Sequence, residues 1–165
     1  MVLTKQELIG ALQNEVRILL HLCGKVKAEM LEYRPTPKQR STIELLRYLT
    51  IMGRVLVPSI KAGSFLVDEW NAREAKAKAM DFDAVVQDLA AQSDFYAQSL
   101  EGLSDEDFRA EVELFGSKSS RGLWLINLVV SGHAAYRMQL FCYLKACGRD
   151  ELNTMNLWAG VDGEM

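Results

Sequence analysis

The side chains that most often carry chemistry are few in this chain, and their spacing does not suit a metal site built on one helix. The sequence has two histidines, His21 and His133, and three cysteines. Two ligands on one helix converge on a metal only when they are three or four residues apart. His21 and Cys23 are two residues apart, which separates them by about 160° around a helix, and Cys142 and Cys147 are five apart. We expect His21 at the surface, opposite the apolar stripe of its helix.

His133 lies in the longest apolar stretch, Gly122 to Gly148, which we predict to be one central helix. A regular helix turns by about 100° per residue, and at this spacing its inward face contains Leu125, Val129, Gly132, Tyr136, Leu140 and Tyr143. His133 then flanks the core. We expect a hydrogen-bonded structural histidine at the core edge or at a subunit contact, and the alternative is a functional histidine that acts as a base or a lone metal ligand.

Two tyrosines and a glycine define a candidate pocket. Tyr48 belongs to the apolar stripe of a predicted second helix, Tyr136 belongs to the inward face of the central helix, and Gly132 beside it leaves room. Converging phenols at such a place suit a small ligand bound between helices. The alternative is that these are structural tyrosines whose hydroxyls find partners in the core. Three further residues of the central helix are accessory candidates: His133, Arg137 and Gln139.

Two other kinds of site find little support. The segment Gly116-Ser117-Lys118 precedes a helix, as a phosphate-binding loop does, but a full motif requires glycines where this chain has Val112 and Ser117. A serine or cysteine hydrolase is not expected, because the chain has no nucleophile-elbow pattern and its two histidines lie on unfavourable faces.

Charge and composition predict a cytoplasmic protein without nucleic-acid or membrane partners. The net charge is −3, whereas nucleic-acid-binding domains are usually strongly basic. Basic residues do gather between Lys25 and Arg40, which we interpret as a solvated helix end and loop and not as a phosphate-binding patch. The unpaired cysteines fit a reducing compartment. The N-terminus leads directly into an amphipathic pattern, and no apolar run is long enough to span a bilayer.

The periodicity predicts a single all-α domain over residues 1–165, built as a four-helix bundle. Capping boxes at Thr4 and Ser41, a capping Asp81 and a turn before Arg121 mark where the helices start. The four helices are predicted at about 4–32, 41–58, 81–100 and 121–148. Between them we expect a long connection at 59–80 with a short exposed helix over 67–80, an extended piece at 110–115, a turn at 116–120 and an irregular tail from 150.

Two stretches carry a resemblance to a known family. The run LEYRPTPKQRSTIELLRYL resembles the entry to helix 2 of the DinB/YfiT-like superfamily, and SGHAAYRMQLFCYLKACG resembles that family's fourth helix. The resemblance covers nearly the whole chain. It implies a four-helix bundle, often dimeric, with a long crossover between helices 2 and 3. It also implies a divalent metal on three histidines, in relatives that include thiol-dependent transferases or isomerases and metal-dependent hydrolases.

The chain departs from this family at the metal ligands. The family's helix 2 histidine falls on Tyr48, and its helix 4 pair falls on Gly132 and Tyr136. His133 lies one position after the first of this pair, and the residue four positions after His133 is Arg137. Glycine has no donor, and neutral tyrosine is a poor zinc ligand. We therefore expect no metal cofactor and a degenerate metal site.

Three functions stay open at this point. The leading interpretation is a non-catalytic or small-ligand-binding protein that uses Tyr48, Gly132 and Tyr136. The first alternative is a metal- or thiol-dependent transferase or hydrolase with non-standard ligands. The second is a homodimeric interaction module, since the central helix is apolar beyond one face.

Overall fold

Four helical rods form the body of the molecule in the computed structural model, which describes residues 3–163. The two residues at each end, including the end of the predicted tail, lie outside this range. The helices and strands are α1 (Lys5–Cys23), α2 (Thr42–Ala62), α3 (Val67–Lys78), α4 (Phe82–Ala90), α5 (Gln92–Glu101), α6 (Asp105–Arg109), β1 (Glu111–Leu114), β2 (Ser117–Ser120), α7 (Arg121–Trp124), η2 (Leu125–Val130) and α8 (Ser131–Ala146). Two short helical segments, η1 (Ala28–Met30) and η3 (Met155–Ala159), complete the chain.

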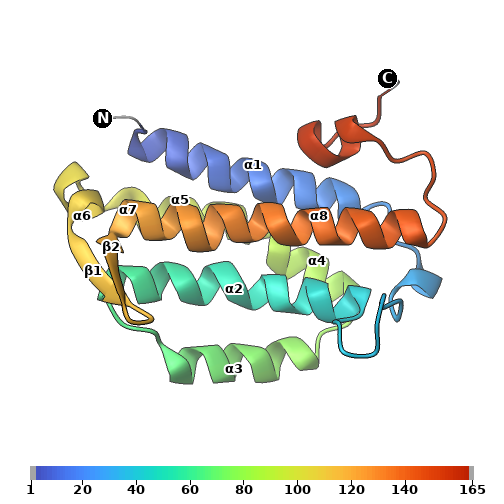
Figure 1. Cartoon of the computed structure of the whole chain (residues 1–165), viewed down its shortest axis with the longest axis horizontal. Helices are drawn as coiled ribbons and strands as arrows, with labels where there is room; N and C mark the ends of the chain where they lie inside the picture. The colour runs from blue at the N-terminus through green and yellow to red at the C-terminus, as the bar shows by residue number, and fades with distance from the viewer. Residues whose placement is uncertain (1–2, 164–165) are drawn as a thin grey trace.

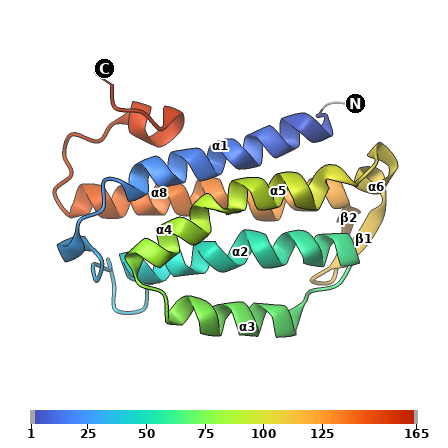
Figure 2. The ribbon, with the colours of Figure 1, turned by 180° about the vertical axis from the view of Figure 1, so that it is seen from behind.

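The rods pack as the predicted bundle. Figure 1 shows α1, α8 and α2 side by side, with α3 on the outer side of α2. Seen from behind, α4 and α5 follow one another along the back of α1 and α2 (Figure 2). Apolar residues from all four rods meet in one continuous core, which includes Leu12, Leu49, Leu89 and Leu140. The all-α class is confirmed. No helix within residues 3–163 is long and apolar enough to cross a membrane.

Two predicted helix ends are wrong. The capping box at Thr4 starts α1 as expected, but the helix ends at Cys23 and not near residue 32, because Gly24 caps it and Lys27 is extended. The opposite holds for α2, which continues through Pro58 to Ala62. The proline removes one backbone donor, but the buried residues around it, Val57 and Ile60 among them, hold the helix in place.

The predicted third helix is broken at Ala91 into α4 and α5. The break accompanies the burial of Gln92, whose side-chain amide donates to the Leu49 carbonyl of α2 at 2.8 Å. The connection before α4 contains the expected short helix, α3, and Ala77 is the one fully buried residue of α3. The crossover between the second and third rods is therefore occupied by a helix that lies against α2.

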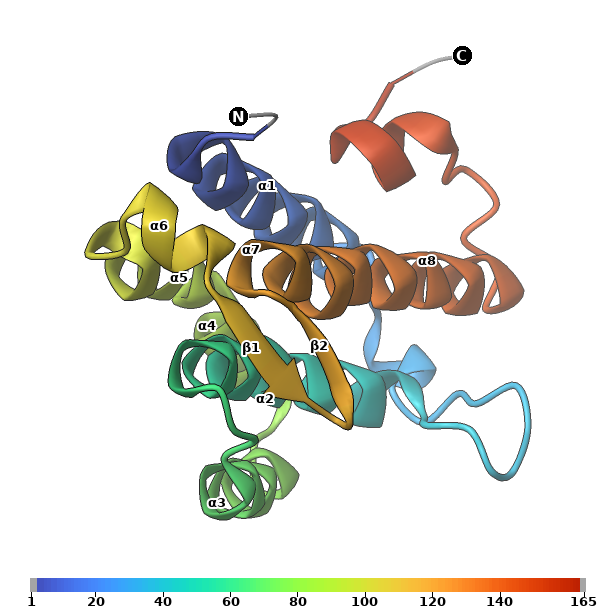
Figure 3. The same cartoon turned by 60° about the vertical axis from the view of Figure 1, so that its left-hand side comes forward.

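A β-hairpin lies where an extended piece and a turn are predicted. The expected extended piece becomes β1, but Ser117–Ser120 form the antiparallel partner strand β2 and not a turn. The turn itself is only Phe115 and Gly116, both with positive φ, the pairing that suits a two-residue hairpin. Figure 3 shows this hairpin lying across the molecule between α7 and α2.

The central helix is continuous but not regular. Between α7 and α8 the six residues of η2 form a π-helix, which has more residues in each turn than an α-helix. The wider turn shifts every later residue around the axis by about one position. The buried positions after it are His133, Arg137, Leu140, Tyr143 and Leu144, while Gly132 and Tyr136 are only half-buried. Regular spacing placed Leu125, Val129, Leu140 and Tyr143 correctly in the core. It was wrong for Gly132 and Tyr136, since the buried residues at this level are His133 and Arg137.

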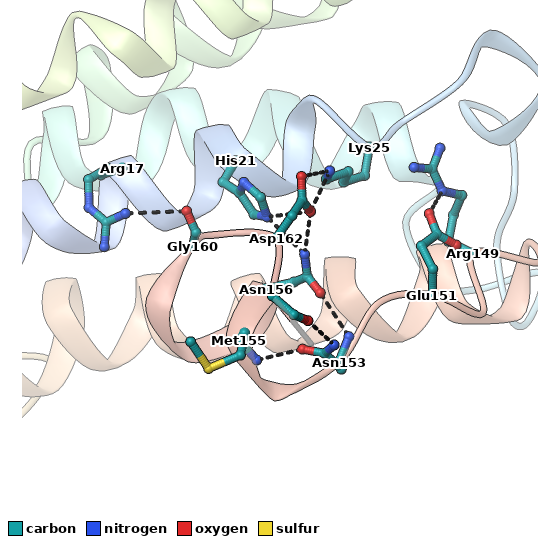
Figure 4. Close-up of polar contacts among 11 residues, drawn as sticks. Arg17, His21, Lys25, Arg149, Glu151, Asn153, Met155, Asn156, Gly160 and Asp162 are labelled. Atoms are coloured by element: carbon teal, nitrogen blue, oxygen red, sulfur yellow. Dashed lines mark hydrogen bonds and ion pairs between the residues drawn. The ribbon is translucent and has the colours of Figure 1, made fainter. Parts of the chain in front are cut away.

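The tail folds back over α1 and covers His21. In Figure 4, Asp162 approaches both Lys25 and His21, and Asn156 of the tail donates a hydrogen bond to Asp162. Lys25 Nζ and an Asp162 carboxylate oxygen are 2.6 Å apart, and Asn156 Nδ2 lies 3.1 Å from His21 Nε2. His21 lies outside the core as expected, but it is less exposed than expected, because the tail leaves only 16% of its side chain exposed.

Candidate functional site: an aromatic groove between α2, α3 and α8

The three residues singled out as a degenerate metal site lie on the wall of one groove. It has a volume of about 540 Å³ and opens between α2, α3 and the central helix. We call it the aromatic groove. It is lined by Tyr48, Met52 and Leu56 of α2, Phe65 and Trp70 around α3, Phe115 of the hairpin, and Asn127, Leu128, Ser131, Gly132, Ala135 and Tyr136 of the central helix.

Tyr48 is the centre of the aromatic contacts. Its ring centroid lies 4.9 Å from that of Tyr136 and 5.9 Å from that of Trp70, in both cases edge to face. Burial, and then the interaction with the Tyr136 hydroxyl, raises the pKa of Tyr48 well above its usual range. The groove therefore presents neutral phenols and ring edges, which suit an apolar or aromatic guest.

The residues at these positions are poorly suited to bind a divalent metal ion. The room that Gly132 leaves is taken by Met52, since a Cβ atom at Gly132 would lie 2.8 Å from the Met52 sulfur. Neutral phenols are weak donors for a divalent ion, and the raised pKa of Tyr48 opposes the phenolate form. Within residues 3–163, moreover, no three His, Cys, Asp or Glu side chains converge on one point.

Three aromatic residues of the groove were not anticipated from the sequence. Phe65 lies 5.6 Å from Trp70 and 5.4 Å from Phe115, measured between ring centroids. Phe65 and Trp70 come from the segment read as a long connection with a short exposed helix, and Phe115 comes from the segment read as an extended piece. Their large aromatic side chains were the one available signal, since such residues contribute most to cores and interfaces, but this signal does not say which groove they line. The Phe115 side chain is 61% exposed at the mouth of the groove.

His133 points away from the groove, into the core on the other side of the central helix. Only 1% of it is exposed. Its Nε2 lies 2.6 Å from the Tyr96 hydroxyl, which in turn contacts the Gln92 side-chain oxygen at 2.8 Å. The Gln92 amide then donates to the Leu49 carbonyl. This chain of hydrogen bonds matches the structural histidine expected for His133, but places it in the core and not at its edge.

The direction of these hydrogen bonds fixes the tautomer of His133. The Tyr96 hydroxyl has one proton, and the Gln92 oxygen can only accept it. His133 Nε2 must then carry a proton and donate to the Tyr96 oxygen. Nδ1 is left as an unpaired acceptor, which agrees with its lack of a hydrogen-bond partner among the described residues. A neutral imidazole satisfies this arrangement, and burial together with the nearby Arg137 charge lowers the pKa of His133 to about 4.

The stability of the protein should fall between pH 6.5 and pH 4. In the unfolded chain His133 gains a proton near its ordinary pKa of about 6.5, whereas in the folded chain it stays neutral until about pH 4. The unfolded state therefore binds more protons in this window, and the free energy of unfolding falls by about 3 kcal/mol as the pH is lowered through it. Urea unfolding at a series of pH values measures this change.

Two variants identify the group responsible. His133→Gln should flatten most of the pH dependence, while His21→Gln should keep it, because the His21 side chain retains contact with solvent. Equal slopes in wild type and His133→Gln would assign the pH dependence to other groups.

The remaining accessory candidates also lie outside the groove. Arg137 is 4% exposed and forms an ion pair with Glu15 of α1 at 3.0 Å, and it donates to the Leu157 carbonyl of the tail. Gln139 donates to the Tyr143 hydroxyl at 2.5 Å. The structure thus brings Tyr48, Gly132 and Tyr136 together and separates them from His133, Arg137 and Gln139.

Comparison with known proteins supports the fold alone. The chain is similar to the crystal structure of a DinB-like protein from Bacillus subtilis, YjoA, with a TM-score of 0.68 and 19% sequence identity. The match covers 89% of this chain and 95% of that chain. No family model and no curated protein matches the sequence. The DinB-like fold implied by the sequence is therefore confirmed on structural grounds.

Proposed function

We propose that this protein of DinB-like fold is a non-catalytic small-molecule-binding protein, and that its ligand inserts an apolar or aromatic body into the aromatic groove. The observation that carries the proposal is the groove itself, about 540 Å³ bounded by the rings of Tyr48, Trp70 and Tyr136. Volumes of this size are typical of small-molecule sites, which are mostly apolar with a few polar groups.

Binding is favoured over catalysis by the groups that face the groove. Its polar side chains are two phenols, Asn127 and Ser131, with no carboxylate, imidazole or thiol among its lining residues. The buried histidine serves the core, and burial raises the pKa of the Cys23 thiol to about 12. A proton transfer or nucleophilic step at this place lacks a group with a suitable pKa. We likewise propose that the protein has no resident metal cofactor.

The neutral fluorescent probe N-phenyl-1-naphthylamine tests the groove. It carries two aromatic units and no charge, and its fluorescence rises in apolar surroundings. We expect saturable binding to wild type, and at least about tenfold weaker binding to Ala135→Trp, because the indole fills part of the groove. Ala135 lines the groove yet is itself exposed, so the change spares the core.

Met138→Trp is the matched control. Met138 lies on the same helix and is 46% exposed, but it does not line the groove. It should bind the probe as wild type does. Loss of binding in both variants, or in neither, would contradict the proposal, provided that thermal melting shows both to be folded.

A homodimer, expected from the family resemblance, stays a prediction. Sedimentation velocity at micromolar concentration tests it, and a monomer would contradict it.

A further inference from the structure

A second cavity adjoins the aromatic groove and is rich in cations. It has a volume of about 370 Å³ and lies between the loop before α2, the start of α2 and the end of α3. Its lining residues are Arg34, Lys38, Gln39, Arg40, Glu44, Arg47, Tyr48, Ile51, Glu74, Ala77 and Lys78. We call it the cationic cleft. Its five basic side chains outnumber its two carboxylates, in a protein whose net charge is −3.

The internal contacts of the cleft leave two cations available. Arg34 pairs with Glu44 at 3.2 Å, and Lys78 pairs with Glu74 at 3.0 Å. Arg47 donates twice to a single backbone carbonyl, at 2.9 and 2.6 Å. Among the described residues, Lys38 and Arg40 have no carboxylate partner. An unpaired arginine and an unpaired lysine in one cleft are suited to bind an anionic group.

Arg40 is held in place before any ligand arrives. Its backbone carbonyl accepts a hydrogen bond from the Tyr143 hydroxyl at 3.0 Å, and Gln139 donates to that hydroxyl in turn. The next residue, Ser41, is buried and caps α2 through its capping box with Glu44. These contacts fix the backbone of the loop to α2 and α8 at Arg40. Such preorganisation reduces the entropy lost on binding.

Tyr48 joins the two cavities, because it lines both. The Arg40 guanidinium carbon lies 4.1 Å from the centroid of the Tyr48 ring, and the Tyr136 centroid lies 4.9 Å from the same point. A molecule with its apolar body against Tyr136 can therefore reach Arg40 across a single aromatic ring. The five donors of a guanidinium match the paired oxygens of a carboxylate, sulfonate or phosphate.

We propose that the ligand of the aromatic groove is an amphipathic anion, whose apolar body lies against Tyr48 and Tyr136 and whose acidic group binds Arg40 and Lys38 in the cationic cleft. This inference rests on the proposed function and adds the chemical class of the ligand. The basic residues between positions 25 and 40 were interpreted from the sequence as a solvated helix end and loop. Under this proposal, two of them, Lys38 and Arg40, bind the ligand.

Two probes that differ by one acidic group test the inference. 8-Anilino-1-naphthalenesulfonate has the same aromatic body as N-phenyl-1-naphthylamine and adds a sulfonate. We expect wild type to bind the anionic probe about tenfold more tightly than the neutral one. Arg40→Gln should abolish this preference while leaving the affinity for the neutral probe within about twofold, and Lys38→Gln should reduce it in part.

Arg73→Gln is the matched control for net charge. Arg73 lies on α3 next to the cleft, pairs with Glu69, and does not line the cleft. It should keep the full preference for the anionic probe. Equal affinities of wild type for the two probes, or equal losses in Arg40→Gln and Arg73→Gln, would overturn the inference and leave the proposed function standing.

The other outcomes separate the two proposals as well. If neither probe binds wild type, both proposals fail. If Arg40→Gln weakens binding of the anionic probe and Ala135→Trp does not, the result supports the acidic subsite and contradicts ligand binding in the aromatic groove. Thermal melting first checks that each variant is folded. Lys38 and Arg40 are both exposed, so replacing them does not disturb the core.

Discussion

Gly53→Ala should destabilise the protein by about 3 kcal/mol or more, although alanine is the better helix former. Gly53 lies inside α2, and a Cβ atom there would overlap the Tyr96 hydroxyl and lie 2.7 Å from the ring carbon that bears it. Tyr96 is fully buried and cannot move without breaking its hydrogen bonds to Gln92 and His133. Each buried polar group left without a partner costs about 1–3 kcal/mol. Denaturant unfolding measures the loss.

Two further variants identify the cause. Gly10→Ala, in the exposed face of α1 with no neighbour within 4 Å of the added atom, should instead stabilise the protein by up to about 1 kcal/mol. Tyr96→Phe removes the overlapping hydroxyl, so the double variant should lose less than the sum of the single losses. Strict additivity of Gly53→Ala and Tyr96→Phe would argue against a direct clash between these residues.

Arg137→Met should destabilise the protein by about 3 kcal/mol, because it leaves a poorly hydrated carboxylate without its cation. The Glu15 side chain is 13% exposed and forms its ion pair with Arg137 at 3.0 Å. The variant also loses the hydrogen bond from Arg137 to the Leu157 carbonyl and the contact of its guanidinium with the Trp158 ring, at 5.6 Å. The tail should therefore become more sensitive to limited proteolysis.

Arg149→Met provides the comparison at an exposed pair. Its partner, Glu151, has 59% of its side chain exposed, so the loss should stay below about 1 kcal/mol. Combining Arg137→Met with Glu15→Gln removes both charges and should recover part of the stability. A loss in Arg137→Met no larger than that in Arg149→Met would show that the buried pair contributes little.

The bundle could be predicted from the sequence because its main signals are local. The capping boxes at Thr4 and Ser41 are both present with both of their hydrogen bonds. Apolar stripes at helical spacing gave the right packing face for α1 and α2. Of the two wrong helix ends, the one at Cys23 reflects the local cap at Gly24. The one at Pro58 depended on tertiary packing, which here outweighs the local cost of a proline inside a helix.

The orientation of the central helix around residues 132–137 could not be predicted, since regular spacing assumes an α-helix throughout. The π-helical turn at Leu125–Val130 shifts the later residues by about one position. It moves His133 and Arg137 into the core and leaves Gly132 and Tyr136 facing the groove. His133 therefore occupies the face of the helix that packs on Tyr96.

Some residues of the candidate site could also be predicted from the sequence, and others could not. Tyr48, Gly132 and Tyr136 could be chosen from the sequence because the family resemblance marks their positions. Trp70 and Phe115 could not, because they reach the groove from α3 and from a hairpin whose placement depends on long-range contacts. Gly53 did carry a signal, since an isolated glycine inside a helix often marks a close approach by a neighbour. Only the structure identifies that neighbour as Tyr96.

The most direct test of the account is the methyl NMR spectrum of the protein labelled with ¹³C at its methionine methyl groups, recorded with and without N-phenyl-1-naphthylamine. Met52 lines the aromatic groove beside Gly132, whereas Met138 and Met155 lie away from it. Ring currents of a bound probe should shift the Met52 signal in a saturable way and leave the other two unchanged. An unmoved Met52 signal at saturating probe, or a larger shift at Met138 or Met155, would contradict a ligand site between α2, α3 and α8.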